Sequence, residues 1–227
     1  MPDHTGDTVR PSLSPAVGID VGEAMTNLAR SRTIFHSEAD FQHAFAWELQ
    51  RLSPEWNIRI EIPVRSYKGA IHLDLLARSS SAEIAVELKY KTRRLSTAVS
   101  GELFSLADQA AQDTGRYDFF RDVCRVETFV RDQPSRLGYA IFLTNDSAYW
   151  KIPSRENCGY AEFAMSEGRV VSGALNWGSM ASEGTRRARE AALVVQSEYT
   201  LRWKPFTEVS AKGYRDFRYL CVQAAAQ

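Results

Sequence analysis

The chain has 227 residues, of which 28 are basic and 28 acidic, so its formal net charge at neutral pH is zero. A hydrophobic fraction of 44% with 25% charged residues is typical of a folded globular protein and excludes a disordered or fibrous one. No apolar run is long enough to span a membrane and no signal-peptide pattern opens the chain, so we expect a cytoplasmic protein with one main domain and no membrane contact.

The cysteine spacing excludes two further classes of protein. Cys124, Cys158 and Cys221 lie far apart in the sequence and form no Cys-x-x-Cys pair. We therefore expect reduced thiols rather than a disulfide framework or a structural zinc site.

The first predicted element is a helix that follows an irregular N-terminal segment. Residues 1–30 are rich in Pro, Gly, Ser, Thr and Asp without periodicity, which predicts a mobile leader with a short helix over residues 21–30. From Ser37, a suitable N-cap, the pattern is helical until Pro54 ends it. The apolar stripe of this helix contains Phe41, Ala44, Phe45, Leu49 and Leu52, together with one acid, Glu48.

Alternating apolar residues then predict three consecutive strands, over residues 58–64, 71–76 and 84–91. A long helix is expected over residues 100–123, and the apolar stretch 138–145 predicts a strand buried on both faces. A strand that follows a crossover helix usually lies parallel to the strand before it. This αβββαβ order therefore predicts the α/β fold class, with a mixed central sheet flanked by helices.

Beyond residue 150 the patterns are shorter. We expect strands over residues 160–165, 169–175, 192–203 and 217–223, and a short basic helix over residues 185–190. The predicted organisation is a leader (1–30), an α/β core (31–150) and C-terminal strands packed on the same domain (151–227).

Three charged residues stand inside two of the predicted apolar strands. Because strand side chains alternate between two faces, Glu87 and Lys89 share one face of the third strand, opposite Val86 and Leu88. Asp74 lies in the second strand, and pairing of the two strands would bring it to the same place.

Two carboxylates and a neighbouring lysine suit metal-assisted hydrolysis. Mg²⁺ or Mn²⁺ prefers oxygen ligands, which Asp74, Glu87 and the backbone carbonyl of Leu88 would supply, with waters in the remaining positions. Lys89 would hold or deprotonate the attacking water and offset the charge that builds on a phosphate. The opposing interpretation is an ordinary exposed ion pair, because a Glu-x-Lys triplet is common.

Asp74, followed after twelve residues by Glu87-Leu-Lys89, resembles the signature of the PD-(D/E)xK nuclease superfamily, in an uncharacterised bacterial branch. Residues 37–145 resemble its restriction-endonuclease-like αβββαβ core. The resemblance implies metal-dependent phosphodiester hydrolysis, with Asp74 and Glu87 as metal ligands and Lys89 as the residue that activates water. Leu73 stands where a proline often precedes the first acid, and many members lack that proline.

Superfamily members often place a further acid on the first helix of the core. Glu48 is our candidate, because a carboxylate on an apolar stripe is costly unless it is paired or used. The alternative is a salt bridge to a buried Arg or Lys. His72 shares the predicted face of Asp74, and we expect a structural role for it.

Substrate contacts are expected among polar residues near this site. Lys91 and Arg93 belong to the densest basic stretch of the chain, and Gln112 and Arg116 lie about one turn apart on the long helix. A solvated or structural role is the alternative for each. We expect core positions for Tyr117, Trp150, Trp177 and Trp203, and a solvated face for the basic run at residues 186–189.

Three functional hypotheses remain. The first is a Mg²⁺- or Mn²⁺-dependent endo- or exonuclease, acting on DNA more than RNA, with a homodimer or partner protein required for a two-strand cut. The second is a non-catalytic module that keeps the fold and binds nucleic acid or a protein. The third is a scaffold protein in which the matching residues are coincidental ion pairs. The complete set of two acids and a lysine favours the first.

Overall fold

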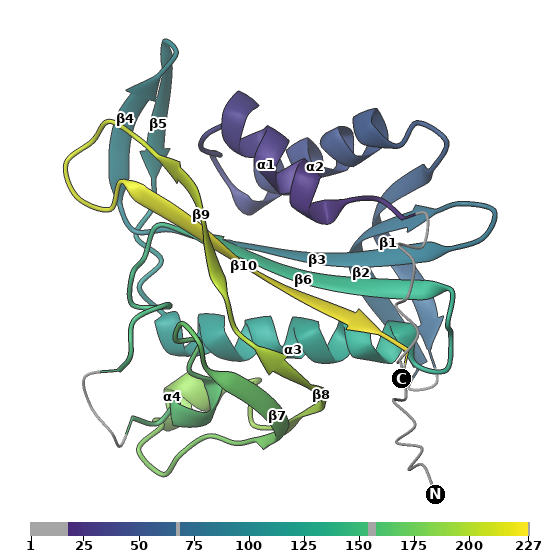
Figure 1. Cartoon of the computed structure of the whole chain (residues 1–227). Helices are drawn as coiled ribbons and strands as arrows, with labels where there is room; N and C mark the ends of the chain where they lie inside the picture. The colour runs from purple at the N-terminus through teal and green to yellow at the C-terminus, as the bar shows by residue number, and fades with distance from the viewer. Residues whose placement is uncertain (1–17, 67–68, 154–157, 227) are drawn as a thin grey trace, which may run out of the picture.

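The central element of the fold is a six-stranded mixed sheet, built from the alternating apolar segments (Figure 1). The computed structural model describes residues 18–66, 69–153 and 158–226. Along the sheet the strands lie in the order β1 (Asn57–Ser66), β2 (Gly69–Arg78), β3 (Glu83–Lys91), β6 (Arg136–Thr144), β10 (Asp216–Ala225) and β9 (Trp203–Glu208). β3 and β6 are parallel, as expected for strands joined by a crossover helix, and the other neighbours are antiparallel.

Helices cover both faces of this sheet (Figure 1). α1 (Val21–Ser31) and α2 (Glu38–Leu52) pack on one face, and α3 (Gln112–Val130) packs on the other. Ser37 caps α2 as predicted, because its hydroxyl accepts a hydrogen bond from the Asp40 amide. The expectation of an α/β protein with a mixed sheet is confirmed.

The helix predicted over residues 21–30 is confirmed as α1, but it belongs to the folded core. Met25 and Leu28 are buried against the sheet. Residues 1–17 of the expected leader lie outside the described residues. The folded part of the chain therefore begins earlier than the predicted boundary at residue 31.

The long helix predicted over residues 100–123 is wrong in its first half. A hairpin of β4 (Leu95–Val99) and β5 (Glu102–Leu106) occupies this region, and α3 starts only at Gln112. Ser100 and Gly101 form the turn with φ values of 51° and 86°, a backbone conformation that ends a helix and closes a hairpin. The helix continues to Val130, seven residues beyond the predicted end.

The C-terminal segment completes the central sheet with β9 and β10, and adds a smaller sheet beside α3. The small sheet pairs β7 (Val170–Leu175) with β8 (Leu193–Thr200). The strand predicted over residues 160–165 is wrong: a 3₁₀ turn, η1 (Ala161–Phe163), lies there, and the Arg169 guanidinium binds the backbone carbonyls of Glu162 and Ala164. The basic helix is shorter than predicted, α4 (Glu183–Arg186).

None of the helices in the described ranges is long and apolar enough to cross a membrane.

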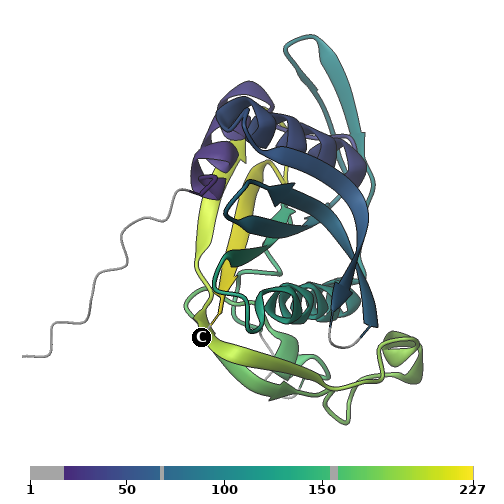
Figure 2. The same ribbon diagram turned by 90° about the vertical axis from the view of Figure 1, so that its right-hand side faces the viewer.

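The regular alternation of side chains breaks at Asp74. Leu73 and Leu76 pack on the α3 face of β2, whereas Leu75 packs on the face of α1 and α2. Opposite Asp74 on β1, Glu61 has a φ of 50°, and this pair is missing from the otherwise continuous β1–β2 register. Figure 2 shows the β1–β2 hairpin, in blue, curving away from the rest of the sheet toward the side of α3. The simple two-face pattern assumed from the sequence therefore fails at the first acid.

Candidate active site

The candidate site forms where β2 separates from β3. The two strands pair only as far as Leu75 and Val86. Beyond this point the Leu88 amide donates a hydrogen bond to Asp74 Oδ2, with a length of 2.7 Å, instead of to a backbone carbonyl of β2. The backbone N–H and C=O of one strand residue point to the same strand edge. The Leu88 carbonyl therefore also lies on the side of β3 where Asp74 is.

A second carboxylate, from α2, binds the next free amide of β3. The Tyr90 amide donates to Glu38 Oε2 at 2.9 Å, and Glu38 Oε1 lies 3.9 Å from Lys89 Nζ. Glu38 is the first residue of α2, directly after the cap Ser37. Periodicity places Glu38 in the first turn of the predicted helix, but nothing in the sequence shows that this turn reaches β3.

Lys89 lies on the α3 face of the sheet, where the structure gives it an acidic partner. Its ammonium lies 3.1 Å from Asp122 Oδ2 of α3, and Asp122 is buried. Asp122 was also missed, because the sequence does not show which face of a helix meets the end of a particular strand. Lys89 is thus held between two helices by Asp122 and Glu38.

Glu87 has the most enclosed side chain of the site, 0% exposed against 2% for Asp122. Arg125, one turn after Asp122 on α3, donates a hydrogen bond to Glu87 Oε2. Glu87 Oε1 is buried and has no hydrogen-bond partner among the described residues. Four carboxylates therefore face two cations, and the cluster carries an excess of negative charge: Glu38, Asp74, Glu87 and Asp122 against Lys89 and Arg125.

This excess shifts the protonation of the buried acids. Burial, with the charges of Asp122 and Asp74, holds the pKa of Glu87 well above its usual range. Burial likewise raises the pKa of Asp74, against the opposing effects of the Leu88 amide and Lys89, and raises the pKa of Asp122 to about 6. Acids that share a buried site and resist ionisation are typical of functional sites.

Lys89 has the opposite tendency. Burial disfavours its ammonium, but the charges of Asp122 and Glu38 outweigh burial and raise the pKa of Lys89. The pKa values of both Lys89 and Asp122 are therefore raised. For Asp122 this occurs because its full burial outweighs the attraction of the lysine. Lys89 is therefore held as a cation, a form suited to stabilising negative charge and unsuited to accepting a proton.

The residues fit a divalent metal ion in two respects. Asp74 and the Leu88 carbonyl lie at the edge of β3 that faces β2, and the charge of Asp74 acts on the neighbouring Glu87. Glu87 Oε1 is buried without a hydrogen-bond partner in the described residues, and a hard cation would stabilise such an oxygen. Within the described part of the chain, no group of three or more His, Cys, Asp or Glu side chains is placed so that it could hold a metal ion. A metal here would therefore depend on the backbone carbonyl and on water for its remaining ligands.

Glu48, the acid proposed on the first helix, lies elsewhere. Its carboxylate is bound by Arg51 of the same helix, at 2.6 and 2.9 Å. The Arg51 hydrogen bonds lower the pKa of Glu48 in spite of burial. Ten residues separate Glu48 from Glu38, which is about 15 Å along an α-helix. The structure thus shows a salt bridge for Glu48, with an exposed rather than the expected buried arginine, and brings Glu38 to the site.

The four residues expected to contact substrate, Lys91, Arg93, Gln112 and Arg116, differ in burial and in their contacts. Lys91 is half-buried at the end of β3. Arg93 pairs with Asp108 at 2.9 Å, and its guanidinium lies over the ring of Tyr214. Gln112 donates to Asp146 at 2.8 Å. In their present contacts Arg93 and Gln112 fix the loops beside the site.

Arg116 is 3% exposed and is part of the packing under α3. Its guanidinium donates to the Ala148 carbonyl at 2.6 Å and lies over the rings of Tyr149 and Tyr160. A phosphate has no direct access to a side chain in this position. His72 is exposed, Arg189 pairs with Asp118, and the predicted core aromatics Tyr117 and Trp203 are buried.

Gln42 of α2 is a supporting residue that the sequence analysis missed. It is buried, and its amide donates to the Asp74 carbonyl at 2.8 Å and to Glu61 Oε1 at 3.0 Å. These two acceptors belong to the residues at which the β1–β2 register is interrupted. Gln42 therefore fixes the backbone distortion that directs the Asp74 carboxylate toward β3.

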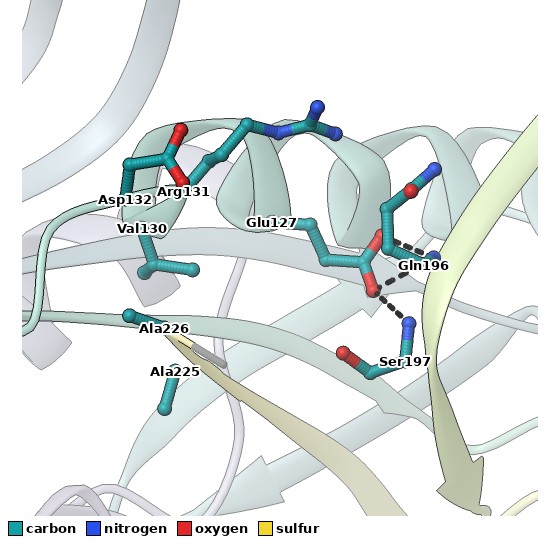
Figure 3. Close-up of a pocket in the computed structure, with 8 residues that line it drawn as sticks. All are labelled: Glu127, Val130, Arg131, Asp132, Gln196, Ser197, Ala225 and Ala226. Carbon is teal, nitrogen blue, oxygen red and sulfur yellow. Dashed lines mark hydrogen bonds between the residues drawn. The ribbon is translucent and has the colours of Figure 1, made fainter.

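A separate cavity of about 250 Å³ lies at the C-terminal end of α3 (Figure 3). Its one central acid, Glu127, accepts hydrogen bonds from the Gln196 and Ser197 amides at 2.9 to 3.0 Å. Tyr199 also donates to this carboxylate. Glu127 therefore joins α3 to β8, and its carboxylate is already satisfied.

Comparison of the chain with protein-family models, curated proteins and solved structures finds no match.

Proposed function

We propose that this protein is a metal-dependent nuclease that hydrolyses phosphodiester bonds, acting on DNA more than on RNA. The single observation that carries the proposal is the hydrogen bond from the Leu88 amide, between Glu87 and Lys89 in the chain, to the Asp74 carboxylate at the point where β2 leaves β3. Asp74 and Lys89 both affect the ionisation of Glu87, so the three charged groups act on one another. The element order α2, β1, β2, β3, α3, β6, with the β4–β5 hairpin inserted before α3, supports the restriction-endonuclease-like core that the sequence resemblance implies.

The residues divide the chemical work between them. When bound, Mg²⁺ or Mn²⁺ would supply Lewis-acid activation of a water and of the scissile phosphate. Asp74, Glu87 and the Leu88 carbonyl would hold the ion. Lys89, held as an ammonium by Asp122 and Glu38, would stabilise the negative charge that develops on the phosphate. Gln42 keeps Asp74 in position from behind.

A non-catalytic binding module is the second candidate, and one observation favours it. Glu87 and Asp122 are buried in ion pairs with Arg125 and Lys89, as in a structural network. In such a module the acids would stabilise the fold, and nucleic acid or a partner protein would bind elsewhere.

Cleavage assays separate the two candidates. Plasmid, linear duplex, single-stranded DNA and RNA are incubated with the wild-type protein and with Lys89→Ala in Mg²⁺ or Mn²⁺. The matched control is Lys212→Ala, which removes an exposed lysine from the loop between β9 and β10. The nuclease proposal predicts cleavage by wild type and Lys212→Ala, with a loss of about 100-fold or more in Lys89→Ala. Equal cleavage by all three proteins, or binding without cleavage by any of them, would contradict it.

A further inference from the structure

Arg125 of α3 is the partner of the most buried carboxylate in the candidate active site. Its guanidinium binds Glu87 and lies 3.1 Å from Asp122 Oδ1. The side chains of Glu87 and Asp122 are 0% and 2% exposed, whereas that of Arg125 is 25% exposed. Arg125 is therefore the member of this group that has an open route to solvent.

The Arg125 guanidinium binds Glu87, the same carboxylate that the proposed function assigns to the metal. A divalent cation binds a carboxylate oxygen directly, at roughly 2.0 to 2.6 Å. A positive guanidinium on the same carboxylate opposes such binding, because two cations a few ångströms apart in a partly dry site repel each other strongly. Metal binding at Glu87 is thus expected to compete with the Glu87–Arg125 pair.

Lys89 differs from Arg125 in this respect. Its ammonium contacts Asp122 and Glu38 rather than Glu87, and its side chain is 15% exposed. A metal on Asp74 and Glu87 would leave both ion-pair partners of Lys89, Asp122 and Glu38, in place. Of the two cations, Arg125 is the one that contacts Glu87, a predicted metal ligand.

We propose, resting on the nuclease function above, that Arg125 is an internal counterion that holds Glu87 in the metal-free protein and turns toward solvent when a divalent metal ion binds. The long aliphatic stem of arginine permits this movement without a change in the helix. Once released, the guanidinium lies at the mouth of the site, where a planar donor suits a phosphate of the substrate. Arg125 is then a positioning and binding residue, and it suppresses metal binding by electrostatic competition.

Chemical labelling of the wild-type protein tests the movement directly. Phenylglyoxal modifies accessible arginines, and mass spectrometry measures the rate at each one, with and without Mn²⁺. We expect metal to raise the labelling rate of Arg125 several-fold. Arg116, buried against Ala148 and two tyrosines, is the internal control and should not change. An unchanged Arg125 rate in protein that binds the metal would overturn the proposal.

Calorimetric titration with Mn²⁺ and Mg²⁺ tests the competition. Arg125→Met should tighten metal binding by about tenfold or more, because the metal no longer displaces a charged hydrogen bond. Lys89→Met removes the same charge from the same cluster and should tighten binding less. Equal effects of the two variants would show that Arg125 acts only through general electrostatics and would overturn the proposal.

The labelling experiment needs no variant, so it decides the question even if Arg125→Met fails to fold. Failure of the proposed nuclease function would give results that differ from those expected if only the Arg125 proposal failed. Wild-type protein that binds no metal and cleaves no substrate would overturn both proposals. Metal-dependent cleavage with an Arg125 that labels equally in both states would overturn this one alone.

Discussion

At the scale of single residues, the candidate site is distinguished by carboxylates that the fold leaves partly uncompensated. Glu87 is enclosed, bears a raised pKa and retains one oxygen without a hydrogen-bond partner in the described structure. A protein selected for stability alone would replace such an acid by a neutral or apolar side chain, because buried charge is costly. The proposed nuclease function, which would require such a site, accounts for its presence.

Glu87→Gln is therefore expected to stabilise the metal-free protein at pH 7.5 while abolishing metal-dependent cleavage. The amide removes one of the mutually repelling buried acids, for a gain on the order of 1 kcal/mol, or about 2–4 °C in melting temperature. The control is Glu83→Gln on the same strand. Glu83 pairs with Arg78 and Arg136 at 2.8 Å, so its replacement should lower the melting temperature. A lower melting temperature for Glu87→Gln in EDTA would contradict the assignment.

Asp122 predicts a pH dependence of stability in the metal-free protein. Its pKa is about 6 in the folded state, against about 3.9 in an unfolded chain. Between these pKa values the folded state binds more protons than the unfolded state does. The free energy of unfolding therefore falls as the pH rises from about 4 to 6. Asp122→Asn should lack this contribution, which is about 1–3 kcal/mol.

Urea unfolding at a series of pH values in EDTA measures this difference. The stability of the wild type relative to Asp122→Asn should decrease across pH 4 to 6 and then level off above the folded-state pKa. A difference between the two proteins that is independent of pH, or that increases over this range, would contradict the prediction.

At the scale of secondary-structure elements, α2 carries two glutamates with different roles. Glu38 in its first turn reaches β3 and Lys89, whereas Glu48 is paired with Arg51 in its last turns. Glu38→Gln should reduce cleavage by about tenfold or more, because it removes charge that holds Lys89 in place. Glu48→Gln should leave the cleavage rate unchanged per folded molecule. Equal losses of cleavage activity in Glu38→Gln and Glu48→Gln, measured at matched folded fractions, would contradict the assignment of Glu38 as the acid that α2 contributes to the site.

The elements themselves could largely be predicted, since α2, β1, β2, β3 and β6 follow directly from periodicity and a serine cap. The β4–β5 hairpin was missed because its turn, Ser100-Gly101, stands in a stretch whose apolar spacing also fits a helix. Choosing between the two requires the tertiary contacts of Leu95 and Phe104, which are buried. Periodicity alone cannot supply those contacts.

The site was predictable only in part, for a similar reason. The strand acids Asp74 and Glu87 are visible as charges inside apolar segments. The selection of Glu48 rested on burial, and a buried acid is equally compatible with an ion pair. Glu38, Asp122 and Gln42 reach the site through the packing of α2 and α3 on the sheet, and their spacing in sequence carries no signal of it.

At the scale of the whole molecule, the central sheet separates two apolar layers, and the site lies where that sheet opens between β2 and β3. The layer of α1 and α2 supplies Glu38 and Gln42, and α3 supplies Asp122 and Arg125 (Figure 1). β9 and β10 complete the sheet beyond β6, which pairs with β3. The C-terminal strands therefore support β3, the strand that positions Glu87 and Lys89, from the side opposite β2. The site therefore depends on the packing of α2 and α3 on the central sheet rather than on a local motif.

The most direct test of the central claim measures metal binding and cleavage in the same samples of wild-type protein and Asp74→Asn. Calorimetry with Mn²⁺ should show one divalent site in the wild type and its loss in Asp74→Asn, with a parallel loss of metal-dependent cleavage. Circular dichroism confirms that both proteins are folded. Wild-type metal affinity and wild-type cleavage in Asp74→Asn would contradict the account.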